Sequence, residues 1–164
     1  MTKLYRPNVG IVIFNRRGEV LQGERMDYLG TWQFPQGGID EGEEPLAGAY
    51  RELYEEVGIK DATFVYEYPE WLTYDFPIAL QQKFLKQGKK FYHGQTQRWF
   101  LFFWDQPVSN CNLQVHDREF HQVKFVPTAS ALDTVADFKR AVYQKVMEAF
   151  VPKIHEYCQA LETP

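Results

Sequence analysis

One patterned stretch, from Gly37 to Ile59, constrains this chain more than any other part of it. Gly37 is followed after five residues by Glu43, and seven further residues lead to Arg51 and a run of acidic residues. The stretch reads G-x5-E-x7-R-E-U-x-E-E-x-G-U, where U is a bulky aliphatic residue. At average residue frequencies its specified positions would match by chance on the order of once in 10⁹ starts. The pattern predicts a glycine-rich loop that runs into an acid-bearing helix.

The second half of this stretch predicts a helix over 45–57. Proline suits a first helical position, because its missing N–H would be unpaired there. Gly58 is typical of the residue that ends a helix. The apolar residues fall at helical spacing on one stripe, which we expect to face the core: Leu46, Ala49, Tyr50, Leu53 and Val57.

Three glutamates lie on the other side of this helix. Glu52, Glu55 and Glu56 are spaced i, i+3 and i+4, so their side chains project from one face. Carboxylates this close repel one another unless water or cations surround them. A solvated acidic surface is one interpretation. The other is a site for hard divalent cations such as Mg²⁺ or Mn²⁺, which take oxygen ligands.

The complete pattern resembles the signature box of the Nudix hydrolases, here residues 37–59. The resemblance implies a single domain over 1–164 with an α/β fold, the Nudix-type α/β/α sandwich built on a mixed β-sheet. It also implies metal-dependent hydrolysis of a nucleoside diphosphate linked to another group, with two or more Mg²⁺ (or Mn²⁺) ions. Metal ions in such a site bridge phosphate oxygens and activate a water molecule.

The same resemblance assigns roles inside the box. Glu52 and Glu56 are expected as metal ligands, and Glu55 as a ligand or as the base for the attacking water. All three glutamates are therefore candidate catalytic residues. Arg51 is expected to pair with Glu43 and hold a carboxylate in position; the alternative is an ordinary surface ion pair.

Segments outside the box resemble one branch of the superfamily, which contains bacterial RNA pyrophosphohydrolases and plant-type diadenosine polyphosphate hydrolases. These segments are residues 5–10, 32–39, 71–74, 94–100 and 138–143. The branch resemblance implies a further metal ligand, Glu119. It implies substrate contacts from Arg6, Arg25, Gln36, Gly37, Tyr74, Gln95, Phe138 and Lys139. Core packing for the aromatic residues and simple surface exposure for the charged ones are the alternatives.

The rest of the chain reads as strands with one further helix. Strands are predicted over 9–14, 19–23, 32–34, 64–68, 71–74, 98–104 and 123–126. Loops are predicted over 25–31 and 36–42. A helix is predicted over 138–150, with a bend at Pro152 before a last segment over 153–161. Strands on both sides of a central helix indicate a mixed sheet packed between helices.

Charge and hydropathy limit the class of partner. The net charge of −4 argues against broad coating of nucleic acid, and DNA is not expected as a partner. No apolar run approaches the roughly 20 residues of a membrane span. The start of the chain has no apolar signal region. These observations predict a cytoplasmic protein with no membrane partner.

The leading functional hypothesis is an RNA 5′-pyrophosphohydrolase that converts a 5′-triphosphate end to a monophosphate and so initiates RNA decay. The alternative is a diadenosine tetraphosphate hydrolase that gives ATP and AMP, to which residues 70–77 look closer. A non-catalytic nucleotide or RNA sensor would be expected to lack a carboxylate of the box, and none is missing. Housecleaning of damaged nucleoside triphosphates is disfavoured by the segments outside the box.

Overall fold

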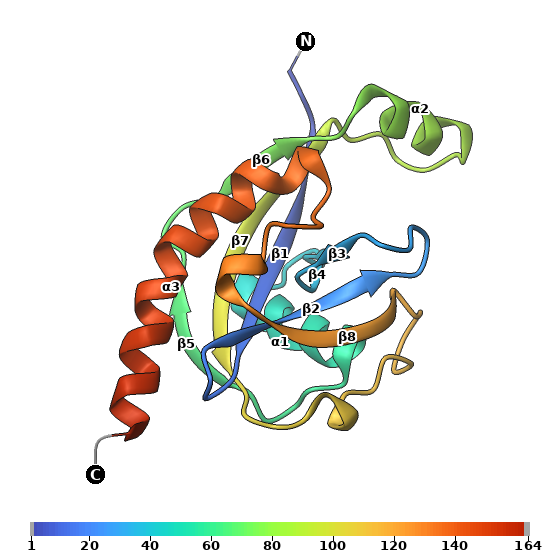
Figure 1. Ribbon diagram of the computed structural model, residues 1–164. Helices are drawn as coiled ribbons and strands as arrows, with labels where there is room; N and C mark the ends of the chain where they lie inside the picture. The colour runs from blue at the N-terminus through green and yellow to red at the C-terminus, as the bar shows by residue number, and fades with distance from the viewer. Residues whose placement is uncertain (1, 163–164) are drawn as a thin grey trace.

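The computed structural model describes residues 2–162 and places a mixed β-sheet between two layers of helix (Figure 1). The strands are β1 Tyr5–Phe14, β2 Glu19–Arg25, β3 Trp32–Gln33, β4 Gln36–Gly38, β5 Thr63–Glu67, β6 Leu72–Asp75, β7 Gly94–Phe103 and β8 Phe120–Pro127. The helices are α1 Pro45–Val57, α2 Ile78–Lys86 and α3 Arg140–Glu162, with short 3-10 turns η1 Val108–Asn110, η2 Thr128–Ser130 and η3 Asp137–Lys139. The predicted α/β/α sandwich with a mixed sheet is confirmed.

The centre of the sheet is the parallel pair β1 and β7, which stay in register from Tyr5 opposite Gly94 to Phe14 opposite Phe103. All the other pairings are antiparallel: β4 and β2 with β1, β5 and β6 with β7, and β3 and β8 with β2. Because β4 lies beside β1, the glycine-rich start of the box is fixed at the middle of the sheet.

Side chains of the central strands alternate between two cores. On β7, Trp99 and Leu101 pack in the core beneath α3, whereas Phe100 and Phe102 pack in the core beneath α1. This alternation follows from the two-residue period of a strand buried on both faces. Both helices therefore bury apolar stripes against the same sheet, which holds α1 rigidly over β4.

Several predicted boundaries need correction. The predicted loop over 36–42 contains β4, because β1 offers unpaired backbone groups at this place. The predicted helix over 138–150 begins at Arg140, after η3, and continues through Pro152 to Glu162 without a break into a separate segment. Ile154 is fully buried and Tyr157 packs edge-on against Phe14 at 5.4 Å, so burial beyond Pro152 offsets its lost hydrogen bond.

Two further differences concern single elements. Helix α2 was predicted by no pattern in the sequence, and it has no buried residue. The prediction that Tyr50 faces the core is wrong: it is 42% exposed, with its ring edge-on to Phe102 at 5.1 Å. A tyrosine at the rim of a core can cover an apolar neighbour and keep its hydroxyl in water. Among residues 2–162, no helix has the length and apolar character needed to cross a membrane.

Candidate active site

The glutamates of α1 face β4, the strand at the start of the box. Helix α1 starts with Pro45 and ends at Gly58, which takes the left-handed conformation (φ 71°) expected of a helix stop. Because Leu53 and Val57 are buried against the sheet, Glu52 and Glu56 are turned toward β4. The Glu52 carboxylate lies against Gly37, and the Glu56 carboxylate accepts a hydrogen bond from the N–H of Gln36. Glu52, Glu55 and Glu56 lie on one face of α1, as the i, i+3, i+4 spacing predicts.

Gly37 allows the Glu52 carboxylate to rest directly against the backbone of β4. A Cβ atom added at Gly37 would overlap the carboxylate of Glu52. The backbone of Gly37 does not take a positive φ, so its lack of a side chain, not its conformational freedom, matters here. The first glycine of the box therefore sets the position of a predicted metal ligand.

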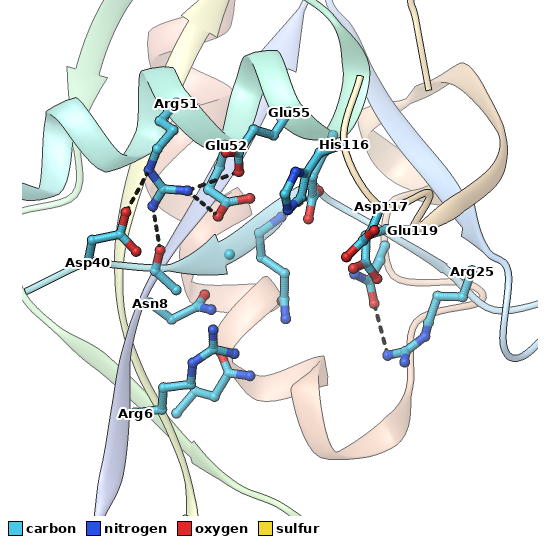
Figure 2. Close-up of a pocket in the computed structure, with 16 residues that line it drawn as sticks. Arg6, Asn8, Arg25, Asp40, Arg51, Glu52, Glu55, His116, Asp117 and Glu119 are labelled. Carbon is cyan, nitrogen blue, oxygen red and sulfur yellow. Dashed lines mark hydrogen bonds and ion pairs between the residues drawn. The ribbon is translucent and has the colours of Figure 1, made fainter. Parts of the chain in front are cut away.

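Arg51 holds the acidic cluster together (Figure 2). Its guanidinium donates two hydrogen bonds of 2.9 Å to the two oxygens of Glu43, so the predicted pair is confirmed. It also donates to Glu52 at 2.8 Å, to Glu55 at 3.0 Å and to the carbonyl oxygen of Gly38 at 2.8 Å. Hydrogen bonding to Arg51 lowers the pKa of Glu43, which is therefore ionised and bound at neutral pH.

Glu56 is the most unusual charge of the site. It is buried, and the only hydrogen bond that its carboxylate accepts within the described chain comes from the backbone N–H of Gln36, at 3.2 Å. Burial raises the pKa of Glu56 well above its ordinary value, and the nearby carboxylates of Glu52 and Glu119 raise it further. Burial also raises the pKa of Glu52, against the opposing effect of Arg51. The site therefore favours any cation that could share these oxygens.

A polar pocket of about 450 Å³ gathers most of the predicted residues. It is lined by Glu52, Glu55, Glu56 and Glu119 among the predicted metal ligands and by Arg6, Arg25, Gln36, Gly37 and Gln95 among the predicted substrate contacts. In Figure 2, Glu52 and Glu55 reach in from the helix, and Arg6 lies across the pocket from them. The guanidinium of Arg25 is bound to Asp27 through hydrogen bonds of 2.8 and 2.7 Å.

The structure adds pocket residues that sequence reasoning missed. Asn8, Gln33, Asp40, His116 and Asp117 also line it. His116 is an exposed loop residue, and the pairing of β8 with β2 brings its loop to the pocket. The close spacing of Asp117 and Glu119 is the one sequence signal that could have pointed to this loop.

The donor set fits hard divalent cations by its chemistry. Six carboxylates line one pocket, among them the four predicted ligands, and the buried carboxylate of Glu56 forms no ion pair with a side chain of the described residues. Within residues 2–162, no three acidic, histidine or cysteine side chains already surround a common point. Arg51 binds one oxygen each of Glu52 and Glu55. The second oxygen of each carboxylate is left for an ion.

A second pocket of about 390 Å³ adjoins the first and holds the remaining predicted contacts: Tyr74, Phe138 and Lys139. The rings of Tyr74 and Phe138 lie 5.6 Å apart. The hydroxyl of Tyr74 and the Oε1 atom of Gln95 are both buried and have no hydrogen-bond partner in the described chain. Unpaired buried polar atoms are costly and rare, so these two atoms point to a ligand that pairs with them.

Lys139 is buried, contrary to the usual expectation for a lysine at a helix start. It is 2% exposed and donates to Gln33 Oε1 at 2.9 Å. Burial, and then the nearby charge of Arg25, lower the pKa of Lys139 to about 7. With a pKa of about 7, Lys139 is only partly protonated at neutral pH. A bound anion would favour the protonated, positively charged form.

This pKa predicts how stability depends on pH. In the unfolded chain Lys139 would keep its proton up to about pH 10.4, whereas in the folded chain it loses it near 7. Burying the charged Lys139 therefore lowers the free energy of unfolding most at pH 7 and below, and this penalty disappears as the pH approaches 10. We expect Lys139→Met to raise the free energy of unfolding by a few kcal/mol at pH 6 and by much less at pH 9.5. Urea unfolding at both values, with Lys145→Met as the exposed control, measures this; a variant less stable than the parent at pH 6 contradicts it.

We compared the whole chain with known proteins. A family model described as the NUDIX domain matches residues 4–146. The chain is 41% identical over 152 residues to an RNA pyrophosphohydrolase of Helicobacter pylori (strain P12), covering 90% of this chain and 94% of that protein. It is 39% identical over 150 residues to Nudix hydrolase 25 of Arabidopsis thaliana, covering 89% and 86%. The structure of the E. coli dihydroneopterin triphosphate pyrophosphohydrolase matches with a TM-score of 0.71 at 20% identity, over 91% of this chain and 98% of that one.

Proposed function

The chain belongs to the Nudix hydrolase family, and from that premise we propose that it is an RNA 5′-pyrophosphohydrolase. It would add water across a phosphoanhydride bond of a 5′-triphosphate end and release pyrophosphate and a 5′-monophosphate RNA, which initiates decay of the transcript. The relative from Helicobacter pylori, 41% identical and similar over nearly its whole length, bears the name of this activity.

The observation that carries the proposal is the arrangement of two adjoining pockets. The pocket lined by the four glutamates, here called the carboxylate pocket, also presents Arg6 and Arg25, which suits a polyphosphate held by metal ions and arginines together. The second pocket, lined by Tyr74 and Phe138 and here called the aromatic pocket, shares Arg25, Gln36 and Gln95 with it. A nucleotide with its phosphates in the first pocket would have its base in the second, against Tyr74 and Phe138.

Nudix hydrolases generally require divalent metal ions. In this chain Glu52, Glu55, Glu56 and Glu119 would hold them, with Mg²⁺ or Mn²⁺ and two or more ions expected. The bound metal would supply charge neutralisation and an activated water. Arg51 fixes Glu52 and Glu55 in place, and Arg6 and Arg25 would bind phosphate oxygens. Lys139 adds positive charge beside Gln36, which borders both pockets.

The deciding experiment compares two substrates under the same conditions. With Mg²⁺, we expect a short 5′-triphosphate RNA to release one pyrophosphate per end and to be hydrolysed with a kcat/KM at least tenfold above that of diadenosine tetraphosphate. The same RNA carrying a 5′-monophosphate is the control and should release nothing, and chelation of Mg²⁺ should stop the reaction. Hydrolysis of the dinucleotide alone, giving ATP and AMP, would contradict the proposal and establish the alternative.

A further inference from the structure

The segment that follows β6 carries an unusual concentration of positive charge. No aspartate or glutamate occurs from Phe76 to Trp104, in a chain whose net charge is −4. The first half of this segment contains four lysines: Lys83, Lys86, Lys89 and Lys90. We call residues 78–90, which comprise α2 and the turn after it, the lysine arm.

The charges of the lysine arm are free to bind a partner. All four lysines are exposed, and none of them forms an ion pair with a carboxylate of residues 2–162. The nearest acid before the arm, Asp75, is already occupied by Lys3 at 2.8 Å and by the Tyr5 hydroxyl at 2.6 Å. No carboxylate of the described residues therefore neutralises a lysine of the arm through an ion pair.

The lysine arm is attached to the molecule at few points. Figure 1 shows α2 projecting beyond the end of β6, away from the sandwich. Leu80 and Phe84 pack against the core from this helix, and the ring of Phe84 lies edge-on to Phe76 at 5.4 Å. Because α2 buries no residue fully, its sequence is not fixed by the core.

The arm is continuous with the candidate active site. Lys83 and Lys89 line the aromatic pocket, beside Tyr74 and Phe138. Lys89 and Lys90 also line a third pocket of about 330 Å³, together with Arg6. Gln95 borders all three pockets, so the carboxylate pocket opens toward the arm.

The third pocket combines positive charge with aromatic surface. Lys89 lies over the ring of Phe84 at 5.4 Å, and Lys90 lies over the ring of Tyr92 at 5.3 Å. A positively charged path lined with aromatic rings is the common way to bind single-stranded nucleic acid without reading its sequence. A folded acidic protein would match the charge but would make no use of a narrow aromatic pocket.

We propose that the lysine arm binds the phosphodiester backbone of single-stranded RNA downstream of the first nucleotide. This inference rests on the proposed function, because it requires the 5′ end to lie in the carboxylate pocket. Because the chain as a whole carries a net charge of −4, we expect RNA to bind along the lysine arm and not over the rest of the surface. A dinucleoside polyphosphate ends after its second base and would gain nothing from the arm beyond it.

The test removes three arm charges and compares substrates of different length. The arm variant is Lys86→Gln/Lys89→Gln/Lys90→Gln, and the matched control is Lys60→Gln/Lys145→Gln/Lys153→Gln, which removes the same charge elsewhere. Glutamine retains helix propensity, and equal melting temperatures check folding. For each protein, kcat/KM is measured on a 20-nucleotide 5′-triphosphate RNA and on a two-nucleotide 5′-triphosphate RNA, at 50 and 200 mM salt.

Three contacts with the RNA backbone predict that the logarithm of affinity falls against the logarithm of salt concentration with a slope of about −2. Between 50 and 200 mM salt this is roughly a 20-fold loss of affinity, and it applies to the long RNA only. We expect the parent and the control to prefer the long RNA at 50 mM salt by tenfold or more and to lose that preference at 200 mM. We expect the arm variant to show neither the preference for the long RNA nor the additional salt dependence on it. Equal preference for length in the arm variant and the parent overturns the inference.

Binding of a fluorescent 5′-monophosphate 20-nucleotide RNA without metal separates the two proposals. If the parent binds this RNA more tightly than the arm variant but hydrolyses neither triphosphate RNA, the proposed function fails and the position of the 5′ end fails with it, whereas binding of RNA by the arm is retained. If the RNAs are hydrolysed but binding is equal in both proteins, the arm inference fails alone. Equal competition by a 20-residue polyglutamate would assign the arm to acidic peptides instead of RNA.

Discussion

Replacing Glu56 with glutamine should lower the rate of hydrolysis by about two to three orders of magnitude and, at the same time, stabilise the protein. Glu56 is buried, and its pKa is raised first by that burial and then by Glu52 and Glu119. A glutamine has nearly the same shape and still accepts the hydrogen bond from the Gln36 N–H. The substitution removes a buried negative charge, which costs free energy when no cation neutralises it and would be needed to bind a metal ion.

The pH dependence of this stability gain has a definite sign. The folded-state pKa of Glu56 lies above its unfolded value of about 4.3, so the folded protein holds an extra proton between the two values. The parent therefore loses stability as the pH rises through that window, and the glutamine variant does not. We expect the difference in melting temperature, measured without divalent metal, to be larger at pH 8 than at pH 4.5.

Glu148→Gln, on the exposed surface of α3, is the control and should change neither rate nor stability. Near-normal turnover by Glu56→Gln would remove this residue from the metal site. A lower melting temperature at pH 8 would show that its charge is compensated in the folded chain.

The local part of the site could be predicted from the sequence, because its signals are local. Helix periodicity places Glu52 and Glu56 on one face, and the spacing between Glu43 and Arg51 spans the loop and two turns of helix. The glycine-rich loop was recognised, but its pairing with β1 was not, since strand pairing depends on an edge supplied by distant residues.

The non-local part of the site could not be predicted in this way. His116 and Asp117 reach the pocket only because β8 pairs with β2. Lys139 reads as a surface lysine in the sequence, and only the packing of η3 beside β6 buries it. Helix α2 has no capping side chain and no buried residue, so neither a start signal nor a core-facing stripe separates it from a loop.

The second large effect is expected at Gly37. In Gly37→Ala the new methyl group would occupy the space of the Glu52 carboxylate, while the backbone of β4 accepts alanine without strain. Glu52 must then move away from the pocket, and Arg51 keeps its contacts with Glu43 and the Gly38 carbonyl. A displacement of about 1 Å in a catalytic group can cost about 100-fold in rate. We expect kcat to fall by that order with a melting temperature within a few degrees of the parent.

The neighbouring glycine provides a matched control for this prediction. A Cβ added at Gly38 would overlap the guanidinium of Arg6 instead of a carboxylate. Because Arg6 is an exposed, flexible side chain proposed to bind phosphate, Gly38→Ala should raise KM and leave kcat nearly unchanged. The two alanine variants therefore separate metal positioning from substrate binding within one short strand. If Gly37→Ala instead raises KM and leaves kcat normal, Glu52 binds substrate and not a catalytic metal ion.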